Sequence, residues 1–185
     1  GLNGSGRAPM AARADRVPAE KNGTIPLFSP YSWTVPGAVD GWFTLHGRFG
    51  KLPMKELLAP AIRAAEEGEP VPQVIAEAWA RSERHFRDKP GFAETFLPGG
   101  RAPREGAIFK NPGLARTYRA LAEEGRDAFY KGDIARRLVK GSRDFGGILS
   151  EQDLASFQGR LDEPVHTGYR GYDVYSNPAT SRGGF

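Results

Sequence analysis

TVPGAVDGWFTLHGRFGKLPMKELLAPAIRAAEEG, residues 34–68, holds the densest run of apolar residues at helical spacing in the chain. Its first half predicts a helix over residues 37–49, because apolar side chains recur every three or four positions and Gly50 follows as a stop signal. Those apolar residues are Ala38, Trp42, Leu45 and Phe49. The stretch contains no nucleophile motif, metal-ligand set or phosphate-binding loop, so it predicts a scaffold rather than a reactive centre.

A second helix is expected to begin at Pro53, because the first helical position needs no amide hydrogen. Pro60 then interrupts the helical pattern, since proline cannot donate to the carbonyl four residues earlier and its ring clashes with the preceding turn. We therefore expect a kink or restart at Pro60, so that residues 37–68 form three short helical pieces joined by tight corners.

The remainder of the chain up to residue 160 predicts mainly helices. We expect them over residues 72–86, 111–125, 133–146 and 150–157, with one helical turn at 92–96 inside a mobile surface connection over 89–110 and a short helix near Met10–Arg13. Two starts carry capping signals. Asn111 stands before Pro112, and Ser150 with Asp153 resembles a capping box, in which each side chain accepts from the backbone amide of the other.

The pattern changes after residue 160, where the chain becomes typical of strands. Val165–Thr167 and Tyr172–Ser176 predict two strands, and Tyr169-Arg170-Gly171 predicts the turn between them. Helices followed by a few C-terminal strands indicate an α+β chain. Such strands need a sheet to join, and we expect most of that sheet to lie outside this sequence.

Composition restricts the class of protein. The chain has 185 residues, of which 39% are hydrophobic and 26% charged, so it can bury a globular core. It contains no cysteine, which excludes disulfides, thiol catalysis and cysteine-bound zinc. No apolar run reaches the ~20 residues that a membrane span needs. The net charge of +4 arises from basic residues interleaved with acidic ones, so we expect no nucleic-acid partner.

Motifs for several common active sites are missing from the sequence. The histidines His46, His85 and His166 lack metal-ligand spacing, and neither a G-x-S-x-G elbow nor a phosphate-binding loop occurs. We therefore expect no metal site and no cofactor. For Asp40, early in the 37–49 helix, we expect a structural role, because its carboxylate can accept from free amides there and complement the helix dipole.

Arg7 is the candidate substrate-binding residue. It stands in LNGSGRAP, residues 2–9, after a glycine turn and before a proline that stiffens the backbone. An arginine held in this way can present its planar guanidinium to a substrate carboxylate. The alternative interpretation is a surface ion pair.

Four collinear blocks resemble the large-subunit region of the gamma-glutamyltransferase family. They are LNGSGRAP (2–9), TVPGAVDGWFTLHGRFGKLPMKELLAPAIRAAEEG (34–68), LARTYRALAEEGRDAFYKGDIARRLV (114–139) and GGILSEQDLASFQGRLDEPVHTGYRGYDVYSNPATSRGG (146–184). The resemblance implies the helix-rich part of a four-layer αββα N-terminal-nucleophile hydrolase fold. Residues 1–185 are then an internal segment of the large subunit, which is a single incomplete domain.

The resemblance also implies a reaction. Precursors of this family are zymogens that cut themselves into two subunits, and the new N-terminal threonine of the small subunit attacks an amide carbonyl, with its free amine as base. The implied enzyme is a heterodimer that cleaves gamma-glutamyl amides such as glutathione and passes the acyl group to water or an amine. Its implied partners are that small subunit and a small carboxylate-bearing amide. The resemblance implies a periplasmic or secreted location without deciding against a cytoplasmic one.

No catalytic residue is expected in this chain, because the family nucleophile lies downstream of the block that contains Thr180. The chain is therefore expected to be inactive alone.

Two departures from the family pattern bear on specificity. Members that bind gamma-glutamyl groups resemble Arg-Glu-Thr-Ala-Pro, whereas this chain has Ser5-Gly6-Arg7-Ala8-Pro9, with the arginine two residues nearer the proline. Residues 177–184, NPATSRGG, replace a pattern closer to Pro-Pro-Pro-Ser-Ser-Gly-Gly. These departures leave open a related acylase or small-amide amidohydrolase without gamma-glutamyl specificity. A helical interaction module without enzymatic activity is the third interpretation.

Overall fold

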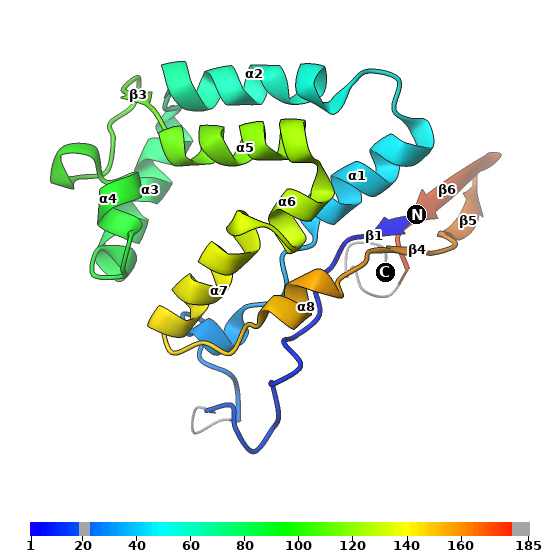
Figure 1. The fold of residues 1–185 in the computed structure, drawn as a ribbon. Coiled ribbons are helices and arrows are strands. Elements are labelled where there is room, and N and C mark those ends of the chain that lie inside the picture. The colour runs from blue at the N-terminus through cyan, green and yellow to red at the C-terminus, as the bar shows by residue number, and fades with distance from the viewer. Residues whose placement is uncertain (19–22, 179–185) are drawn as a thin grey trace. The chain divides into compact units, whose positions relative to one another are not determined.

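The computed structural model describes residues 1–18 and 23–178 of the chain (Figure 1). These residues belong to two compact units: unit 1 comprises Gly1–Lys51 and Glu124–Phe185, and unit 2 comprises Leu52–Glu123. Helices predominate, and the described strands pair only two by two. The expected helix-rich α+β class is therefore confirmed. Within the described ranges, no helix combines the length and the apolar character that crossing a bilayer would require.

Unit 1 is built on helices that pack around α6. Its helices are η1 (Pro30–Ser32, a 3-10 turn), α1 (Ala38–Phe49), α6 (Arg126–Tyr130), α7 (Asp133–Asp144) and α8 (Glu151–Ala155). Helix α6 contacts α1, α7 and α8, and the buried side chains of this core include Val39, Tyr130, Val139, Leu154 and Phe157. The sequence predicted α1, α7 and α8 but missed α6, since five residues are too few to establish a helical period.

Three pairs of antiparallel strands complete the described structure. In unit 1, β1 (Leu2–Asn3) pairs with β4 (Arg160–Leu161), and β5 (Val165–Tyr169) pairs with β6 (Tyr172–Ser176). The predicted hairpin is therefore confirmed. Its turn consists of Arg170 and Gly171, whose φ angles of 49° and 83° match the left-handed pair that a tight two-residue hairpin turn requires.

The hairpin is exposed on both of its faces. The side chains of Val165, Tyr169, Tyr172, Val174 and Tyr175 are all exposed, and Tyr172 retains 77% of its accessible surface. No other part of the chain that the structure describes covers these apolar strands, and their joining a sheet from elsewhere in the protein stays a prediction.

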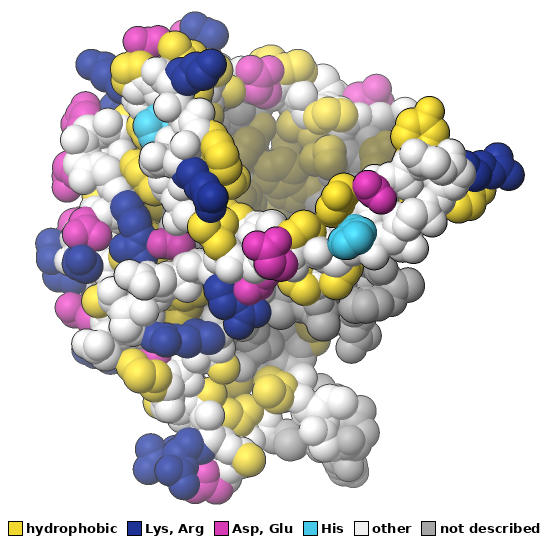
Figure 2. Space-filling model, turned by 90° about the vertical axis from the view of Figure 1, so that its right-hand side faces the viewer, with side chains coloured by type: hydrophobic (Ala, Val, Ile, Leu, Met, Phe, Trp, Pro, Cys, Tyr) yellow, Lys and Arg dark blue, Asp and Glu magenta, His cyan; other side chains and the backbone are white. Residues whose placement is uncertain are grey.

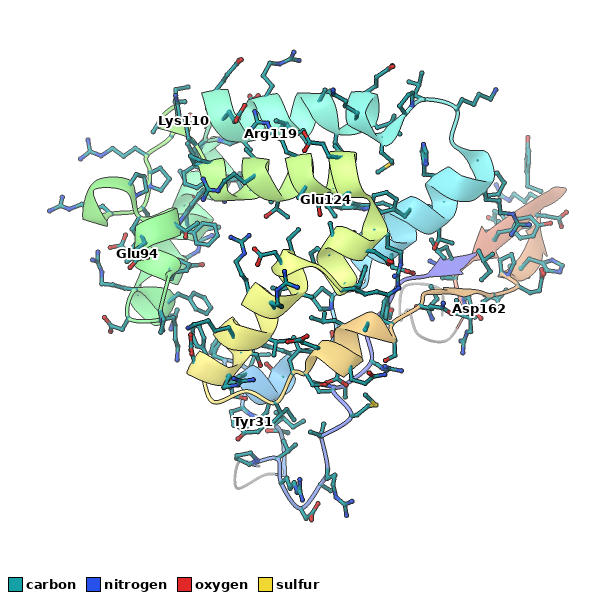
Figure 3. The ribbon with its side chains drawn as sticks, in the orientation of Figure 1. Tyr31, Glu94, Lys110, Arg119, Glu124 and Asp162 are labelled. Atoms are coloured by element: carbon teal, nitrogen blue, oxygen red, sulfur yellow. The ribbon has the colours of Figure 1, made fainter. Side chains whose placement is uncertain are left out.

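Unit 2 consists of helices joined by short connections. It contains α2 (Met54–Glu67), β2 (Glu69–Pro70), α3 (Gln73–Phe86), α4 (Phe92–Phe96), η2 (Pro98–Gly100), β3 (Ile108–Phe109) and α5 (Pro112–Glu124), and β2 pairs with β3. Arg119 on α5, labelled in Figure 3, forms an ion pair with Glu66 on α2, and that hydrogen bond lowers the pKa of Glu66. The predicted Asn111 cap is confirmed, because its Oδ1 accepts from the amide of Leu114 at 2.9 Å.

Two local predictions were wrong. Helix α2 continues through Pro60 without a break, so residues 37–68 form two helices instead of three pieces. Pro60 and Glu56 are both exposed, and the Glu56 carbonyl that lacks an amide partner can be hydrated there. The chain near Met10–Arg13 forms a turn instead of a helix, closed by the Ala12 amide donating to Pro9 O at 2.9 Å.

Tyr130 gives unit 1 a specific dependence on alkaline pH. Its hydroxyl is fully buried, donates to Pro36 O at 2.7 Å and accepts from the Asp40 amide at 3.0 Å. Burial raises the pKa of Tyr130, although the hydrogen bond from Asp40 works in the opposite direction. The pKa of Tyr130 is therefore higher in the folded state than in the unfolded state. The stability linked to this difference is fully present below about pH 10, the unfolded-state value, and is lost as pH rises through the folded-state pKa.

We expect Tyr130→Phe to lower stability by about 1–2 kcal/mol at neutral pH, because two hydrogen bonds are lost. The variant should also lose less stability than the wild type between neutral pH and about pH 11, because it has no buried hydroxyl to ionise. Thermal unfolding of the full-length protein across this pH range measures both effects. Tyr172→Phe, at an exposed position, is the matched control. If the wild type and Tyr130→Phe lose the same amount of stability at alkaline pH, the assignment of Tyr130 as the group whose ionisation destabilises unit 1 is contradicted.

Candidate functional site

The segment that carries Arg7 packs closely against the chain before α1. The Val35 amide donates to Arg7 O at 3.0 Å. A Cβ atom on Gly6 would lie 1.8 Å from Val35 O, and one on Gly37 would lie 1.9 Å from Gly4 O, so neither position has room for a side chain. The glycines of the first two family-like blocks therefore permit the backbone contact that places Arg7.

Helix α8 holds the same segment from a second direction. The predicted capping box is confirmed: Ser150 Oγ accepts from the Asp153 amide at 3.2 Å, and Asp153 Oδ2 accepts from the Ser150 amide at 2.9 Å. The fully buried Asp153 also accepts from the Met10 amide, through Oδ1 at 2.7 Å. One carboxylate thus caps α8 and fixes the chain three residues after Arg7.

The Arg7 guanidinium is exposed and is oriented by the last turn of α8. Its Nη2 donates to Ser156 Oγ at 2.5 Å, and Ser156 Oγ in turn donates to Gln152 O at the same distance. A guanidinium carries five N–H donors in one plane, and the contact with Ser156 uses one of them. The geometry therefore suits an arginine that is held at one edge while it binds an anion.

Arg7 lines an open groove on unit 1, which we call the Arg7 groove. It has a volume of about 390 Å³ and is lined by Asn3, Ser5, Gly6, Arg7, Ser156, Phe157, Gln158 and Arg160. One wall comes from the end of β1 and the residues that follow it, and the other comes from residues 156–160, which follow α8. The structure thus places Arg7 beside polar side chains that are about 150 residues away in the sequence.

A second arginine, Arg160, lies in the Arg7 groove but carries its own counter-ion. Its Nη2 donates to Asp162 Oδ2 at 3.0 Å, and its Nε donates to the other oxygen of that carboxylate. The hydrogen bond from Arg160 lowers the pKa of Asp162, which is labelled in Figure 3. Arg7 is therefore the better candidate for an external carboxylate. Figure 2 shows basic and acidic side chains interspersed over the face it presents.

Asp40 does not line the Arg7 groove. Asp40 has a structural role as expected, but its partners differ from those predicted: its carboxylate bonds to Arg126 and to the Gly159 amide instead of the amides of its own helix. Over the described ranges, no group of His, Asp and Glu side chains is arranged to hold a metal ion. Thr180 and the Gly183-Gly184 pair lie outside the described residues.

Sequence reasoning missed Ser156, Gln158 and Arg160. The capping box gives an indirect signal for Ser156. It marks the start of a short helix at Glu151, and Ser156 is the residue that directly follows the last residue of that helix. Nothing in the local pattern marks Gln158 or Arg160, because their proximity to Arg7 depends on how the chain returns after α8.

Comparisons with known proteins identify relatives of this chain. The glutathione hydrolase proenzyme of Bacillus subtilis (strain 168) is 34% identical over 182 residues, which is 96% of this chain and 31% of that protein. The oxamate amidohydrolase proenzyme of Klebsiella pneumoniae is 38% identical over 172 residues, which is 89% of this chain and 32% of that protein. The chain therefore spans about a third of the length of these relatives.

A solved structure and a family model define the class and the family. The crystal structure of cephalosporin acylase from Bacillus halodurans superposes with a TM-score of 0.87 and 38% identity, covering 96% of this chain and 34% of that one. This similarity confirms the expected fold class, the helix-rich α+β part of an N-terminal-nucleophile hydrolase. The gamma-glutamyltranspeptidase family model matches residues 1–185, and the chain belongs to that family. Its relatives are enzymes, which favours the enzymatic interpretations over the interaction module.

Proposed function

We propose that the protein containing this chain is an amide hydrolase and acyltransferase, and that Arg7 binds a carboxylate of its acyl donor. The observation that carries the proposal is the position of the Arg7 guanidinium, exposed in a groove and held at one edge by Ser156. A planar guanidinium fixed in this way matches a carboxylate through two parallel hydrogen bonds. The residues of this chain bind and orient the substrate, and the reacting group comes from another part of the protein.

The chemical step follows from a threonine at the N-terminus of a small subunit. Its hydroxyl oxygen forms a bond to the amide carbonyl carbon while its own α-amine takes the proton. The C–N bond then breaks, the leaving amine receives that proton, and the acyl group remains as an ester on the threonine. Water or an amine acceptor attacks the ester and releases the threonine. The relatives' description as proenzymes supports a precursor that is cleaved to generate such a terminus.

The leading substrates are gamma-glutamyl amides such as glutathione, as the name of the Bacillus subtilis relative suggests. Two observations favour a second candidate, an acylase or small-amide amidohydrolase. Arg7 stands two residues nearer Pro9 than the arginine of the gamma-glutamyl-binding pattern. The cephalosporin acylase and the oxamate amidohydrolase are also each 38% identical to this chain. Both candidates need a carboxylate-binding residue. The feature that distinguishes their substrates is the remainder of the acyl group.

Turnover by the full-length processed protein separates these candidates. We expect hydrolysis of anilides with a free carboxylate on the acyl group, tested as a gamma-glutamyl anilide and a glutaryl anilide, which differ by the α-ammonium group. Faster turnover of the gamma-glutamyl anilide, accelerated by a dipeptide acceptor, would indicate the transferase. Faster turnover of the glutaryl anilide without an acceptor effect would indicate the acylase. Absence of turnover with both, in protein shown to be cleaved into two subunits, would overturn the proposal.

A further inference from the structure

An ion pair between Asp40 and Arg126 is mostly withdrawn from solvent in unit 1. Arg126 Nε donates to Asp40 Oδ1 at 2.5 Å, and the two side chains are only 23% and 5% exposed. The Arg126 guanidinium also lies over the Tyr130 ring, with its central carbon 4.3 Å from the ring centroid. A buried pair of this kind is costly to desolvate unless its remaining donors and acceptors are also satisfied.

Two further hydrogen bonds of the pair reach the segment that follows α8. Arg126 Nη2 donates to the carbonyl oxygen of Phe157, and Asp40 Oδ2 accepts from the Gly159 amide at 2.6 Å. These two contacts lie on either side of Gln158. The pair therefore fixes the backbone at both neighbours of a groove-lining residue.

Gly159 leaves little freedom for this segment to shift. A Cβ atom on Gly159 would lie 2.8 Å from Asp40 Oδ2 and 3.2 Å from Asn3 O. The backbone at Gly159 is thus confined between the Asp40 carboxylate and the segment that leads to Arg7. A displacement at this point would move both walls of the Arg7 groove.

We propose that Asp40 and Arg126 are positioning residues for the Arg7 groove: they hold residues 156–160 so that Ser156 directs the Arg7 guanidinium at the substrate carboxylate. The inference rests on the proposed function. Neither residue lines the groove, so neither is expected to touch substrate. Their effect passes through two backbone contacts and the hydrogen bond from Arg7 to Ser156.

The test is Asp40→Asn in the full-length enzyme, because asparagine keeps the shape of the side chain and removes the charge that pairs with Arg126. We expect KM for a carboxylate-bearing anilide to rise about tenfold, since a misplaced binding group costs affinity steeply. The kinetic constants for a matched anilide whose carboxylate is replaced by a methyl group should change less than about twofold. Arg126→Lys keeps the charge but loses the fork that reaches Phe157 O, so we expect a smaller rise in KM.

Asp144→Asn is the matched control, because Asp144 forms an exposed ion pair with Lys140 on α7 and should leave all constants unchanged. Hydrogen exchange at the Gly159 amide gives a readout without substrate, and faster exchange in Asp40→Asn is expected. If Asp40→Asn fails to fold or to be cleaved into subunits, Arg126→Lys carries the same test.

Three results would overturn the inference. An unchanged KM in Asp40→Asn, while Arg7→Ala raises it, would reject the positioning role and leave the proposed function intact. An unchanged KM in both variants would reject the role of Arg7 as well. An equal fall in kcat for the substrates with and without a carboxylate would show a general structural role instead of a positioning role.

Discussion

Replacing Asp153 by alanine is expected to raise hydrogen exchange at the Met10 amide more than about a hundredfold, which corresponds to a loss of about 3 kcal/mol. Asp153 is fully buried, and its carboxylate accepts from the Met10 amide, the Ser150 amide and the Ser150 hydroxyl. Alanine would leave these donors without a partner inside the protein, and each such loss is costly. The measurement is native-state hydrogen exchange of the full-length protein.

Ser150→Ala is the control for this effect. It removes the other half of the capping box but keeps the bond from Met10 to Asp153. We expect it to cost about 1 kcal/mol, the usual value of an N-cap, with most of the change at the start of α8. Equal exchange at Met10 in both variants would contradict the assignment of Asp153 as the anchor of the Arg7 segment.

Replacing Arg7 by alanine is expected to raise KM for a carboxylate-bearing amide about a hundredfold in the full-length enzyme, because a charge-assisted bidentate contact contributes about 2–3 kcal/mol. The value of kcat should change much less, since the carboxylate is bound in both the ground state and the transition state. Arg7→Lys keeps the charge but loses the planar fork, so it should recover only part of the affinity.

Arg13→Ala serves as the matched control for Arg7→Ala. Arg13 lies on the same segment, is 67% exposed and pairs with Asp15 at 3.2 Å. Exposed ion pairs of this kind contribute little to the stability of the protein, so KM of Arg13→Ala should stay within about twofold of the wild-type value. A rise in KM that is equal in Arg7→Ala and Arg13→Ala would indicate a general effect of positive charge, and the specific role of Arg7 would then be rejected.

Most elements could be predicted from the sequence because they depend on local rules. The period of apolar residues predicted α1, α3 and α5, the Ser150 and Asp153 pair predicted α8, and turn chemistry predicted the β5–β6 hairpin. The restart predicted at Pro60 was wrong, because the helix tolerates a proline where the unpaired carbonyl of Glu56 is accessible to solvent, which a sequence does not show. Local signals therefore identify elements better than they describe their geometry.

The candidate site could be predicted only in part. Arg7 stood out because glycines precede it and a proline follows, and those glycines do mark a close backbone contact. Asp40 and Arg126 are 86 residues apart, and neither position differs locally from an ordinary charged residue on a helix. Their pairing, and the meeting of Arg7 with Ser156, depend on tertiary packing that no spacing rule contains.

The most direct test of the carboxylate-binding site compares two substrates in the wild-type full-length enzyme. The ratio of kcat/KM for a glutaryl anilide and for the matched anilide with a methyl group in place of the carboxylate measures how strongly the enzyme selects that carboxylate. We expect the carboxylate to be preferred about a hundredfold in the wild type and almost not at all in Arg7→Ala. A wild-type ratio near one, or a ratio that Arg7→Ala leaves unchanged, would contradict the assignment of Arg7 as the carboxylate-binding residue.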